Sequence, residues 1–579
     1  MKRLITYLLL AILLGVISGR TILTLFEPVY ITWEEQPSRL IIFTLLFITM
    51  YLLFFHQLYH NGRKFLLDLF KPYHFIVVAL MTYLFYFSTA GEMEHLEIGG
   101  SIGIFPITTL AILTYAVLSW TILYTIINVS WRISWQQEMP SKLVILWFAI
   151  PVIIMGTVYW FGFFPGPMTP DSFNHWRQSI DHDFSNWHPM IYTTLTMILT
   201  TFWDNPAVVT LFQVFVLASV YGYSMYSLRR IGLPYLPLII ATALFIILPA
   251  AGIYAVTFWK DVLYSIFLML FTVFFMNIVM SKGKWLLSWR SIILLTITMI
   301  MLSFFRNNGL PIVIVSLLIL GIFYFKHWKR IIIPIGTTVL TYVIITGPVF
   351  DAMSVNSAQS IESLSIPHQQ IGYILNNEGE LTDEQEAYLE RLMPIETWKE
   401  AYHPFLSDHI KFHDDLNREK LAEEIPQYIR NWAGIVSGNF GLAVDGYLLQ
   451  TSVVWQVHLP EQGYTAAYAH RVFDNEHGIE MNPVSDRLHT ELMSYLEYTE
   501  EYTLELLWRP ALFALLLILI TAAGVIKNGM TALVVSAPVL LNWATMLAAI
   551  PAQDFRYLLG NYFILFVVAL FSLGKYRRE

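Results

Sequence analysis

The sequence predicts an all-α polytopic membrane protein with about fourteen transmembrane helices, interfacial helices in its first long outer loop, and a mostly α extracytoplasmic domain before its last three spans. Three observations support this class. Hydrophobic residues make up 56% of the 579 residues and charged residues only 13%, whereas charged residues are about a quarter of a soluble domain. Apolar runs of spanning length recur along the chain, and one long acidic segment interrupts them. Soluble globular enzymes and disordered chains are therefore excluded.

The candidate spans are predominantly apolar runs close to the roughly 20 residues that a helix needs to cross a bilayer. They lie at 4–25, 39–56, 74–90, 104–128, 143–163, 206–227, 233–252, 261–281, 290–305, 309–326, 330–348, 508–526, 530–550 and 556–574. No small-residue cleavage site follows the first run, so we expect an uncleaved anchor rather than a signal peptide. The chain contains no cysteine, which excludes disulfides, thiolate metal sites and a cysteine nucleophile.

The distribution of lysine and arginine predicts the orientation of these spans. With the N-terminus in the cytoplasm, 19 of the 34 basic residues fall in cytoplasmic turns and tails. Six fall in short outer loops or at outer span ends, and nine fall in 350–509. Every cytoplasmic turn then carries at least one basic residue. We therefore expect a multi-pass plasma-membrane protein with both termini in the cytoplasm.

The apolar stretch from His188 to Trp203 admits two interpretations. It begins with His188-Pro189 directly after a polar loop, and only a few residues separate it from the next span. We expect a helix that lies in the outer interface, with Trp203 at headgroup depth. The alternative is a short true span, which would place Arg229 and Arg230 outside.

The acidic segment divides the chain into three predicted regions. Residues 351–505 contain 27 acidic and eight Lys or Arg residues, so their net charge is −19, and the rest of the chain carries +11. We expect a transmembrane body at 1–349 with an outer loop at 164–205, an acidic extracellular domain at 350–507, and the last three spans at 508–579.

Local patterns predict that the acidic domain is mostly helical. Thr382 followed by three acidic or amide residues is typical of a helix start. Helical patterns continue over 383–393 and 415–433. Residues 447–457 are rich in β-branched and aromatic side chains, which suits either a strand or a buried helix.

Polar residues gather at the predicted outer ends of the spans. Ionisable groups at the edge of the hydrocarbon are costly, so several of them at one depth predict a shared polar pocket. The candidate members are the carboxylates Asp171, Asp183, Asp261 and Asp554, the cations Lys260, Arg306 and Arg556, and their partners His188, Asn307 and Tyr557.

The chemistry of this set points to a phosphate and a hydroxyl group. Arginine binds phosphate through two parallel hydrogen bonds, and lysine binds it as a point charge. A carboxylate is suited to accepting a proton from a hydroxyl group, or to holding a divalent cation. A lipid phosphate together with a hydroxyl acceptor describes glycosyl transfer from a membrane-anchored sugar donor.

The order of the motifs resembles GT-C-type membrane glycosyltransferases. A span ending in Phe164-Pro165-Gly166 leads into Thr169-Pro170-Asp171-Ser172 and then into an aspartate-rich loop. This loop looks like the first outer loop of that superfamily, which carries the catalytic aspartate, matched here by Asp171. The turn Asp554-Phe555-Arg556-Tyr557 resembles an acidic-x-Arg-Tyr turn found late in several such enzymes. In layout, the chain is similar to a largely uncharacterised family of polytopic proteins from Gram-positive bacteria, and Tyr402-His403-Pro404 with Ser407-Asp408 looks like a motif of their outer domain.

The resemblance implies an inverting transfer from a polyprenyl-phosphate-linked sugar to a glycan or glycolipid of the cell envelope, such as a cell-wall polysaccharide. Asp171 would be the general base. Lys260, Arg306, Arg556 and His188 would bind the donor phosphate, and Asp183, Asp261, Asn307, Asp554 and Tyr557 would support them. Some members have a second acidic residue where Ser172 stands here, so a requirement for Mg²⁺ or Mn²⁺ stays open, with Asp171, Asp183 and Asp261 as its ligands. We expect membrane lipids but no nucleic acid among the partners.

Other interpretations of the same residues stay open. Asp171 also suits the cap of a helix over 173–180, Lys260 and Asp261 suit a local ion pair, and Arg306 suits contact with the headgroups. For the whole chain, the alternatives are a transporter or flippase of a lipid-linked sugar, and a non-catalytic membrane scaffold. Transporters usually carry polar or broken segments near the membrane midplane, whereas here the charges gather at one predicted face.

Overall fold

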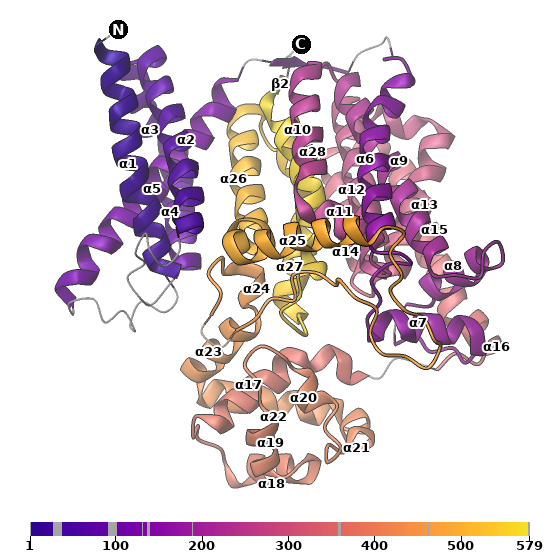
Figure 1. Cartoon of the computed structure of the whole chain (residues 1–579). Coiled ribbons are helices and arrows are strands. Elements are labelled where there is room, and N and C mark those ends of the chain that lie inside the picture. The colour runs from indigo at the N-terminus through magenta and orange to yellow at the C-terminus, as the bar shows by residue number, and fades with distance from the viewer. Residues whose placement is uncertain are drawn as a thin grey trace.

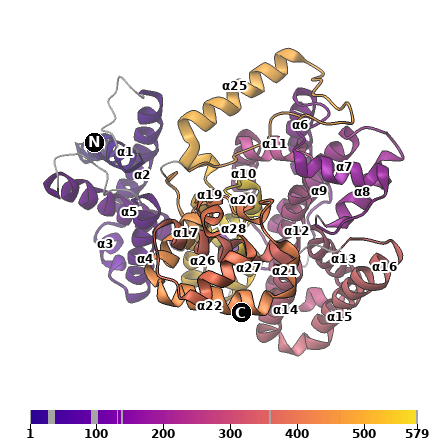
Figure 2. The same cartoon turned by 90° about the horizontal axis from the view of Figure 1, so that it is seen from below.

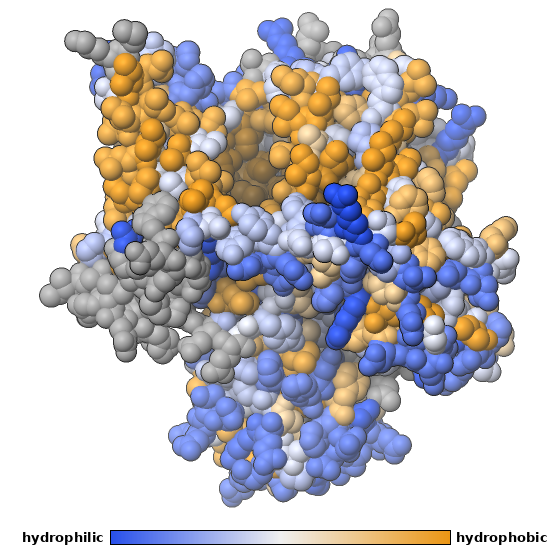
Figure 3. Space-filling view, viewed as in Figure 1, coloured by the Kyte–Doolittle hydropathy of each residue, from blue (hydrophilic) through white to orange (hydrophobic). Residues whose placement is uncertain are grey.

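The chain is an all-α polytopic membrane protein. The computed structural model describes residues 2–26, 37–90, 101–129, 131–135, 139–187, 189–356, 360–460 and 463–576. Both termini lie at one end of a helix bundle, and a group of short helices projects from the opposite end (Figure 1). The bundle surface is predominantly apolar and the projecting helices are predominantly hydrophilic (Figure 3), as a membrane-embedded body and a water-exposed domain require.

Among the described residues, eleven helical segments are long and apolar enough to cross a membrane. Their main helices are α1 (Lys2–Phe26), α2 (Pro37–Asn61), α4 (Pro72–Thr89), α5 (Ser101–Asn128), α6 (Leu143–Gly162), α9 (Ala207–Arg230), α12 (Lys260–Met280), α15 (Trp328–Ile344), α26 (Pro510–Asn528), α27 (Thr531–Ala549) and α28 (Leu559–Leu573). Two further predicted spans correspond to α13 (Trp289–Phe305) and α14 (Gly309–Phe323), which are apolar but shorter.

The predicted span at 233–252 is bent rather than straight. It consists of α10 (Tyr235–Ile247) and α11 (Pro249–Val256), which meet at an angle of 60°. Pro249 explains the break, because proline has no N–H for the helical hydrogen bond and disfavours a helical residue before it. Leu248 accordingly adopts an extended conformation, with φ of −66° and ψ of 135°.

The loop after α6 carries two short helices, α7 (Pro170–Asp181) and α8 (Met190–Thr200). At about 1.5 Å per residue, the 11 residues of α8 extend only about half-way across a bilayer core of roughly 30 Å. Residues 189–203 therefore do not form a spanning helix. The helix α8 packs against α7, and the two lie to one side of the projecting helices when the molecule is seen from below (Figure 2).

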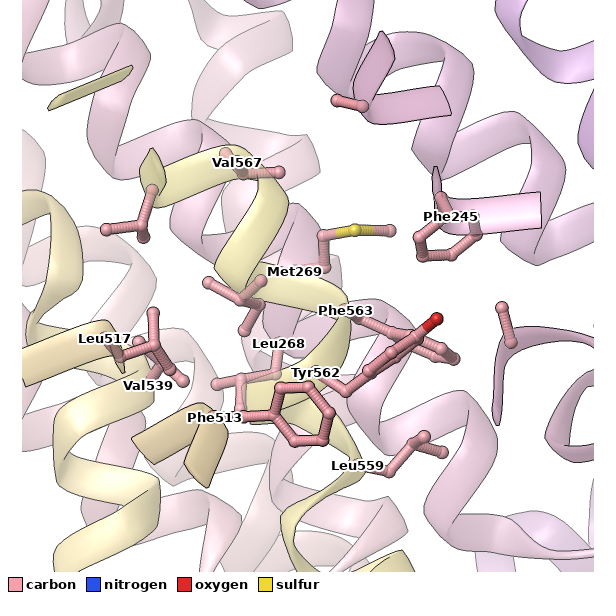
Figure 4. Packing of buried hydrophobic residues seen from close by; sticks show 14 of the residues in the cluster. Phe245, Leu268, Met269, Phe513, Leu517, Val539, Leu559, Tyr562, Phe563 and Val567 are labelled. Carbon is pink, nitrogen blue, oxygen red and sulfur yellow. The ribbon is translucent and has the colours of Figure 1, made fainter. Parts of the chain in front are cut away.

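The bundle core lies where α12, α26, α27 and α28 meet (Figure 4). Leu268, Phe513, Val539 and Tyr562 each come from a different one of these helices, and all four are buried. Lipid tails are as apolar as these side chains, so helix association depends on close packing. The helix α12 lies at the centre of the bundle. In its most apolar stretch of 18 residues, 89% of the residues are buried inside the protein, against 17% for the corresponding stretch around α15.

The acidic region contains a separate helical domain over residues 360–450, which we call the cap. Its own hydrophobic core extends from Ile361 to Ala443. Its elements are η5 (Ser360–Leu364), α17 (Ser365–Asn376), α18 (Asp383–Leu392), α19 (Ile395–Ala401), α20 (Asp408–Lys411), α21 (Arg418–Glu423), α22 (Ile425–Gly438) and α23 (Phe440–Gln450). The helix start at Thr382 is confirmed, because its side-chain oxygen accepts from the Gln385 amide at 3.3 Å. In the stretch 447–457, residues 447–450 end α23 and residues 452–455 form a further short helix, so most of it is helical.

The rest of the acidic region returns to the bundle instead of joining the cap. It includes α24 (Ser452–Trp455) and α25 (Asp486–Thr503), and α25 crosses in front of the bundle, above the cap (Figure 1). The Tyr495 hydroxyl donates to the carbonyl oxygen of Ile247 at 2.7 Å, where the break between α10 and α11 leaves that carbonyl without a helical partner.

The remaining elements are short connections. They are α3 (Arg63–Leu69), α16 (Phe350–Ala352), η2 (Lys284–Leu287), η3 (Phe325–His327), η4 (Ile345–Val349), η6 (Leu504–Trp508), η7 (Phe555–Leu558), and the parallel strands β1 (Trp131–Ile133) and β2 (Gly574–Tyr576). Among them, η7 matters for the site, because it carries Arg556 and Tyr557 on the cap side.

Candidate functional site

A pocket of about 470 Å³ lies between the cap and the bundle. It brings together seven of the residues predicted for the polar site. They are Asp171, Lys260, Asp261, Arg306, Asn307, Arg556 and Tyr557. These residues come from α7, the start of α12, the α13–α14 turn and η7, so widely separated segments of the chain meet at one depth.

The start of α7 is tied to the segment that precedes α12, which positions Asp171 next to Lys260. The Trp259 indole donates to the Thr169 hydroxyl at 2.8 Å. The Ser172 hydroxyl donates to the Phe258 carbonyl, also at 2.8 Å. The N-cap of α7 is Thr169, so Asp171 does not cap the helix. Its position in the first turn still suits a carboxylate, because the helix dipole is positive there.

Arg556 joins two carboxylates. Its Nη1 lies 2.6 Å from Oδ2 of Asp171, and its Nε lies 2.8 Å from Oδ2 of Asp554. The guanidinium also lies 4.7 Å from the centroid of the Trp259 ring. A guanidinium offers five N–H donors in a planar fork, so the geometry of Arg556 suits recognition of planar or tetrahedral oxyanions.

A second ion pair closes the other side of the pocket. Arg306 Nη1 lies 2.9 Å from Oδ1 of Asp261, and these side chains are 12% and 3% exposed. The Arg306 guanidinium lies 5.0 Å from the ring centroid of Tyr557 and 5.5 Å from that of Tyr264. Asp261 is thus a buried carboxylate with a matched cation, the arrangement that buried charge requires.

Lys260 and the α13–α14 turn complete the bundle side of the site. Lys260 is the first residue of α12, and its side chain lines the pocket. The side-chain amide of Asn308 donates to the Thr545 hydroxyl of α27 at 2.9 Å, which fixes the turn that carries Arg306 and Asn307. Three cations of the bundle therefore surround one space at the ends of apolar helices.

Asp554 lies behind Arg556 and has an unusual environment. Burial raises the pKa of its carboxyl group to about 6, although the neighbouring Arg556 guanidinium and backbone N–H act in the opposite direction. Its Oδ1 accepts from the Arg556 amide at 3.0 Å. Asp554 does not line the pocket, so it orients Arg556 from behind.

Besides Asp554, two predicted site residues are not brought into this pocket by the described structure. Asp183 is exposed, in the connection between α7 and α8, and does not line it. His188 lies outside the described residues.

The predicted metal ligands do not fit a cation site. Asp171 and Asp261 each contact an arginine, and Asp183 does not line the pocket that these two share. Within the described residues, no group of three or more His, Asp or Glu side chains is arranged to hold a metal ion.

Sequence reasoning missed the contribution of the cap. Ser363, Asp408, Lys411 and Phe412 line the same pocket, as does Trp187 of the α7–α8 connection. A short motif containing Asp408 is visible in the sequence. Nothing in that motif indicates that the cap folds back over the ends of the spans.

Comparison with known proteins identifies the family. Residues 181–579 match a family of unknown function, DUF6020. Since this is well over half of the chain, the protein belongs to that family. Lys260, Arg306 and Arg556 lie within the matched region, and Asp171 precedes it. No curated protein and no solved structure shows a significant match.

Proposed function

We propose that this member of the DUF6020 family is a GT-C-like membrane glycosyltransferase. It transfers a sugar from a polyprenyl-phosphate-linked donor to a cell-envelope acceptor at the outer face of the plasma membrane, with inversion at the anomeric carbon. Asp171 is the general base, and Arg556, Lys260 and Arg306 bind the donor phosphate. The proposal places the cap outside and both termini in the cytoplasm, in agreement with the distribution of basic residues.

The contact between Asp171 and Arg556 carries this proposal. A carboxylate suited to proton transfer lies 2.6 Å from a guanidinium suited to phosphate, in a pocket that also contains Lys260 and Arg306. The pocket lies at the cap-side ends of apolar helices, where the headgroup of a lipid would lie if its chain remained in the bilayer. These are the parts that a transfer from a lipid phosphate requires.

The geometry implies an order of events. An arriving phosphate competes with Asp171 for the Arg556 guanidinium, so donor binding releases the carboxylate that the reaction needs. Asp171 then accepts the proton of the acceptor hydroxyl. The hydroxyl oxygen forms a bond to the anomeric carbon as the bond from that carbon to the phosphate oxygen breaks. The phosphate leaves with the electron pair, and the three cations stabilise its charge.

One feature favours the transporter alternative. The α10–α11 pair is broken, and transporters use broken helices at their binding sites. However, residues 249–256 are all buried and almost entirely apolar, and the carbonyl freed at Ile247 is bonded by Tyr495. The break in the helix is therefore better explained by helix packing than by a binding site for an ion or a substrate.

Purified protein in lipid nanodiscs, supplied with polyprenyl-phosphate sugars and a cell-envelope extract as acceptor, tests the proposal. We expect release of polyprenyl phosphate together with transfer of the radiolabelled sugar. Asp171→Asn should lower kcat by about 10²–10⁴-fold, the usual contribution of a general base. Asp183→Asn is the matched control, because Asp183 is exposed and outside the pocket, and it should retain activity. Equal activity of the two variants would contradict the assignment of the base.

A further inference from the structure

The wall of the pocket that faces away from the bundle is made by the cap. Asp408, Lys411 and Phe412 belong to α20 and the residue that follows it, and Ser363 belongs to η5. The Phe412 ring lies 5.6 Å from the ring of Trp187 between their centroids, so a cap residue and a bundle residue meet across the site. The pocket therefore has two walls of different origin.

The cap is attached to the bundle at the turn that carries Arg556. The Ser407 amide and hydroxyl both donate to the Pro551 carbonyl, at 3.2 and 3.1 Å. The Gln450 side chain donates to the Ile550 carbonyl at 2.7 Å, and the Gln553 side chain donates to the Gln450 carbonyl at 2.9 Å. These bonds hold α20 in a defined position relative to η7, so the two walls form one preorganised site.

The side chains of the cap wall differ in chemistry from those of the bundle wall. The bundle wall contributes three cations together with the carboxylates of Asp171 and Asp261, whereas the cap wall contributes the Ser363 hydroxyl, the Phe412 ring and the paired side chains of Asp408 and Lys411. The Lys411 ammonium lies 2.7 Å from Oδ1 of Asp408, and the Lys411 side chain is 2% exposed while that of Asp408 is 43% exposed. Lys411 thus acts mainly as a buried support, and Asp408 presents oxygen to the pocket.

A carboxylate beside aromatic rings matches a polyhydroxylated ring. A carboxylate accepts hydrogen bonds from hydroxyl groups, and the electron-rich face of an aromatic ring attracts the weakly positive C–H groups of a pyranose. Phosphate is better matched by the bundle wall, which offers two arginines and Lys260. In the cap wall the Lys411 ammonium is buried and paired with Asp408.

We infer that Asp408, Phe412 and Trp187 form the subsite for the sugar of the donor, and that the cap thereby determines which sugar is transferred. This inference rests on the proposed function. In a lipid-phosphate sugar, the sugar lies on the side of the phosphate opposite the lipid. With the phosphate at Arg556, Lys260 and Arg306, the sugar points out of the bundle and toward the cap wall. Lys411 is a positioning residue for Asp408.

Binding measurements with short-chain probes test this inference. The probes are farnesyl phosphate and farnesyl phosphate carrying glucose, galactose, mannose or arabinose, and their Kd values are measured for the full-length protein in nanodiscs. We expect wild type to bind at least one sugar-bearing probe about tenfold or more tightly than farnesyl phosphate. Asp408→Asn and Phe412→Leu should abolish that difference and leave the Kd of farnesyl phosphate unchanged. Lys411→Met should act like Asp408→Asn.

The controls separate a sugar subsite from a loss of folding. Asp414→Asn changes an exposed carboxylate in the same part of the cap that does not line the pocket, and it should retain the preference for the sugar. The inference would be overturned if a cap variant weakened the binding of both kinds of probe equally. It would also be overturned if wild type bound no sugar-bearing probe more tightly than farnesyl phosphate. If farnesyl phosphate binds neither wild type nor the cap variants, the proposed function fails and the sugar subsite fails with it.

Discussion

Arg556 Nη1 contacts Asp171 Oδ2 at 2.6 Å across a sequence separation of 385 residues. The same guanidinium contacts Asp554 through its Nε. One cation therefore connects the loop after α6 with the turn before α28. Replacement of Arg556 should therefore affect both the recognition of phosphate and the packing of these two segments.

Arg556→Lys should lower activity although it preserves the positive charge. An ammonium is a compact point charge and cannot reproduce the planar fork that reaches both carboxylates or two phosphate oxygens. Removing one such oxyanion-stabilising contact typically lowers kcat by about 10²–10³-fold. The measurement is steady-state transfer from a polyprenyl-phosphate sugar in nanodiscs. Arg487→Lys, at an exposed position of α25, is the control, and wild-type kcat in Arg556→Lys would exclude a fork-like contact with the phosphate.

Asp554 should make the stability of the protein depend on pH between about 4 and 6. Its pKa in the folded protein is about 6, against an ordinary value of 3.8, so within this window the folded state binds more protons than the unfolded state. Stability contributed by this group is therefore lost as pH rises from 4 to 6 and is constant above that. At about 1.4 kcal/mol per pKa unit, the loss is at most about 3 kcal/mol.

Unfolding of wild type and Asp554→Asn between pH 4 and 7.5 measures this effect. Asparagine cannot titrate, so the stability of the variant relative to wild type should rise from pH 4 to 6 and then level off. Tryptophan fluorescence in mixed micelles provides the readout. Parallel curves for the two proteins would show that Asp554 titrates at an ordinary pKa.

The positions of the spans and the depth of the charged residues were predictable from sequence, because apolar runs and basic turns constrain both. Residues at one depth, such as Lys260 and Arg306, were therefore expected in one pocket, and they line it together. Their partners were not predictable. Arg306 pairs with Asp261, and Arg556 pairs with Asp171, because of which helices are neighbours in the bundle. Apolar spans of similar composition contain no local pattern that predicts these neighbours.

The cap and the broken helix show two further limits of sequence reasoning. Residues 233–252 read as one apolar run, and only Pro249 indicates the 60° bend. Asp408 and Phe412 lie in an acidic, water-exposed region, where local patterns predict helices but not the surface against which they pack. Their place in the pocket follows from long-range contacts such as that of Ser407 with Pro551.

Breaking the buried pair of Arg306 and Asp261 should destabilise the protein. Asp261→Ala leaves a mostly buried guanidinium without its carboxylate, and removal of one partner of a buried pair costs about 3–5 kcal/mol. The double variant Asp261→Leu, Arg306→Met should recover most of that loss, because it removes both charges. Denaturation in mixed micelles gives the three values. The exposed pair of Glu396 and Lys399 supplies the control, and Glu396→Ala should have no measurable effect.

Two glycines of α14 should respond in opposite ways to replacement by alanine. A Cβ at Gly309 would lie 1.9 Å from the carbonyl oxygen of Leu302, whereas a Cβ at Gly321 would meet no atom within 4 Å. Gly309→Ala must therefore displace the backbone of the turn that carries Arg306, at a cost of about 1–3 kcal/mol or more. Gly321→Ala should stabilise the helix by up to about 1 kcal/mol, because alanine has the higher helix propensity. Equilibrium unfolding of both variants tests this contrast. A Gly309→Ala protein as stable as wild type would mean that the α13–α14 turn is not held as closely as the position of Arg306 requires.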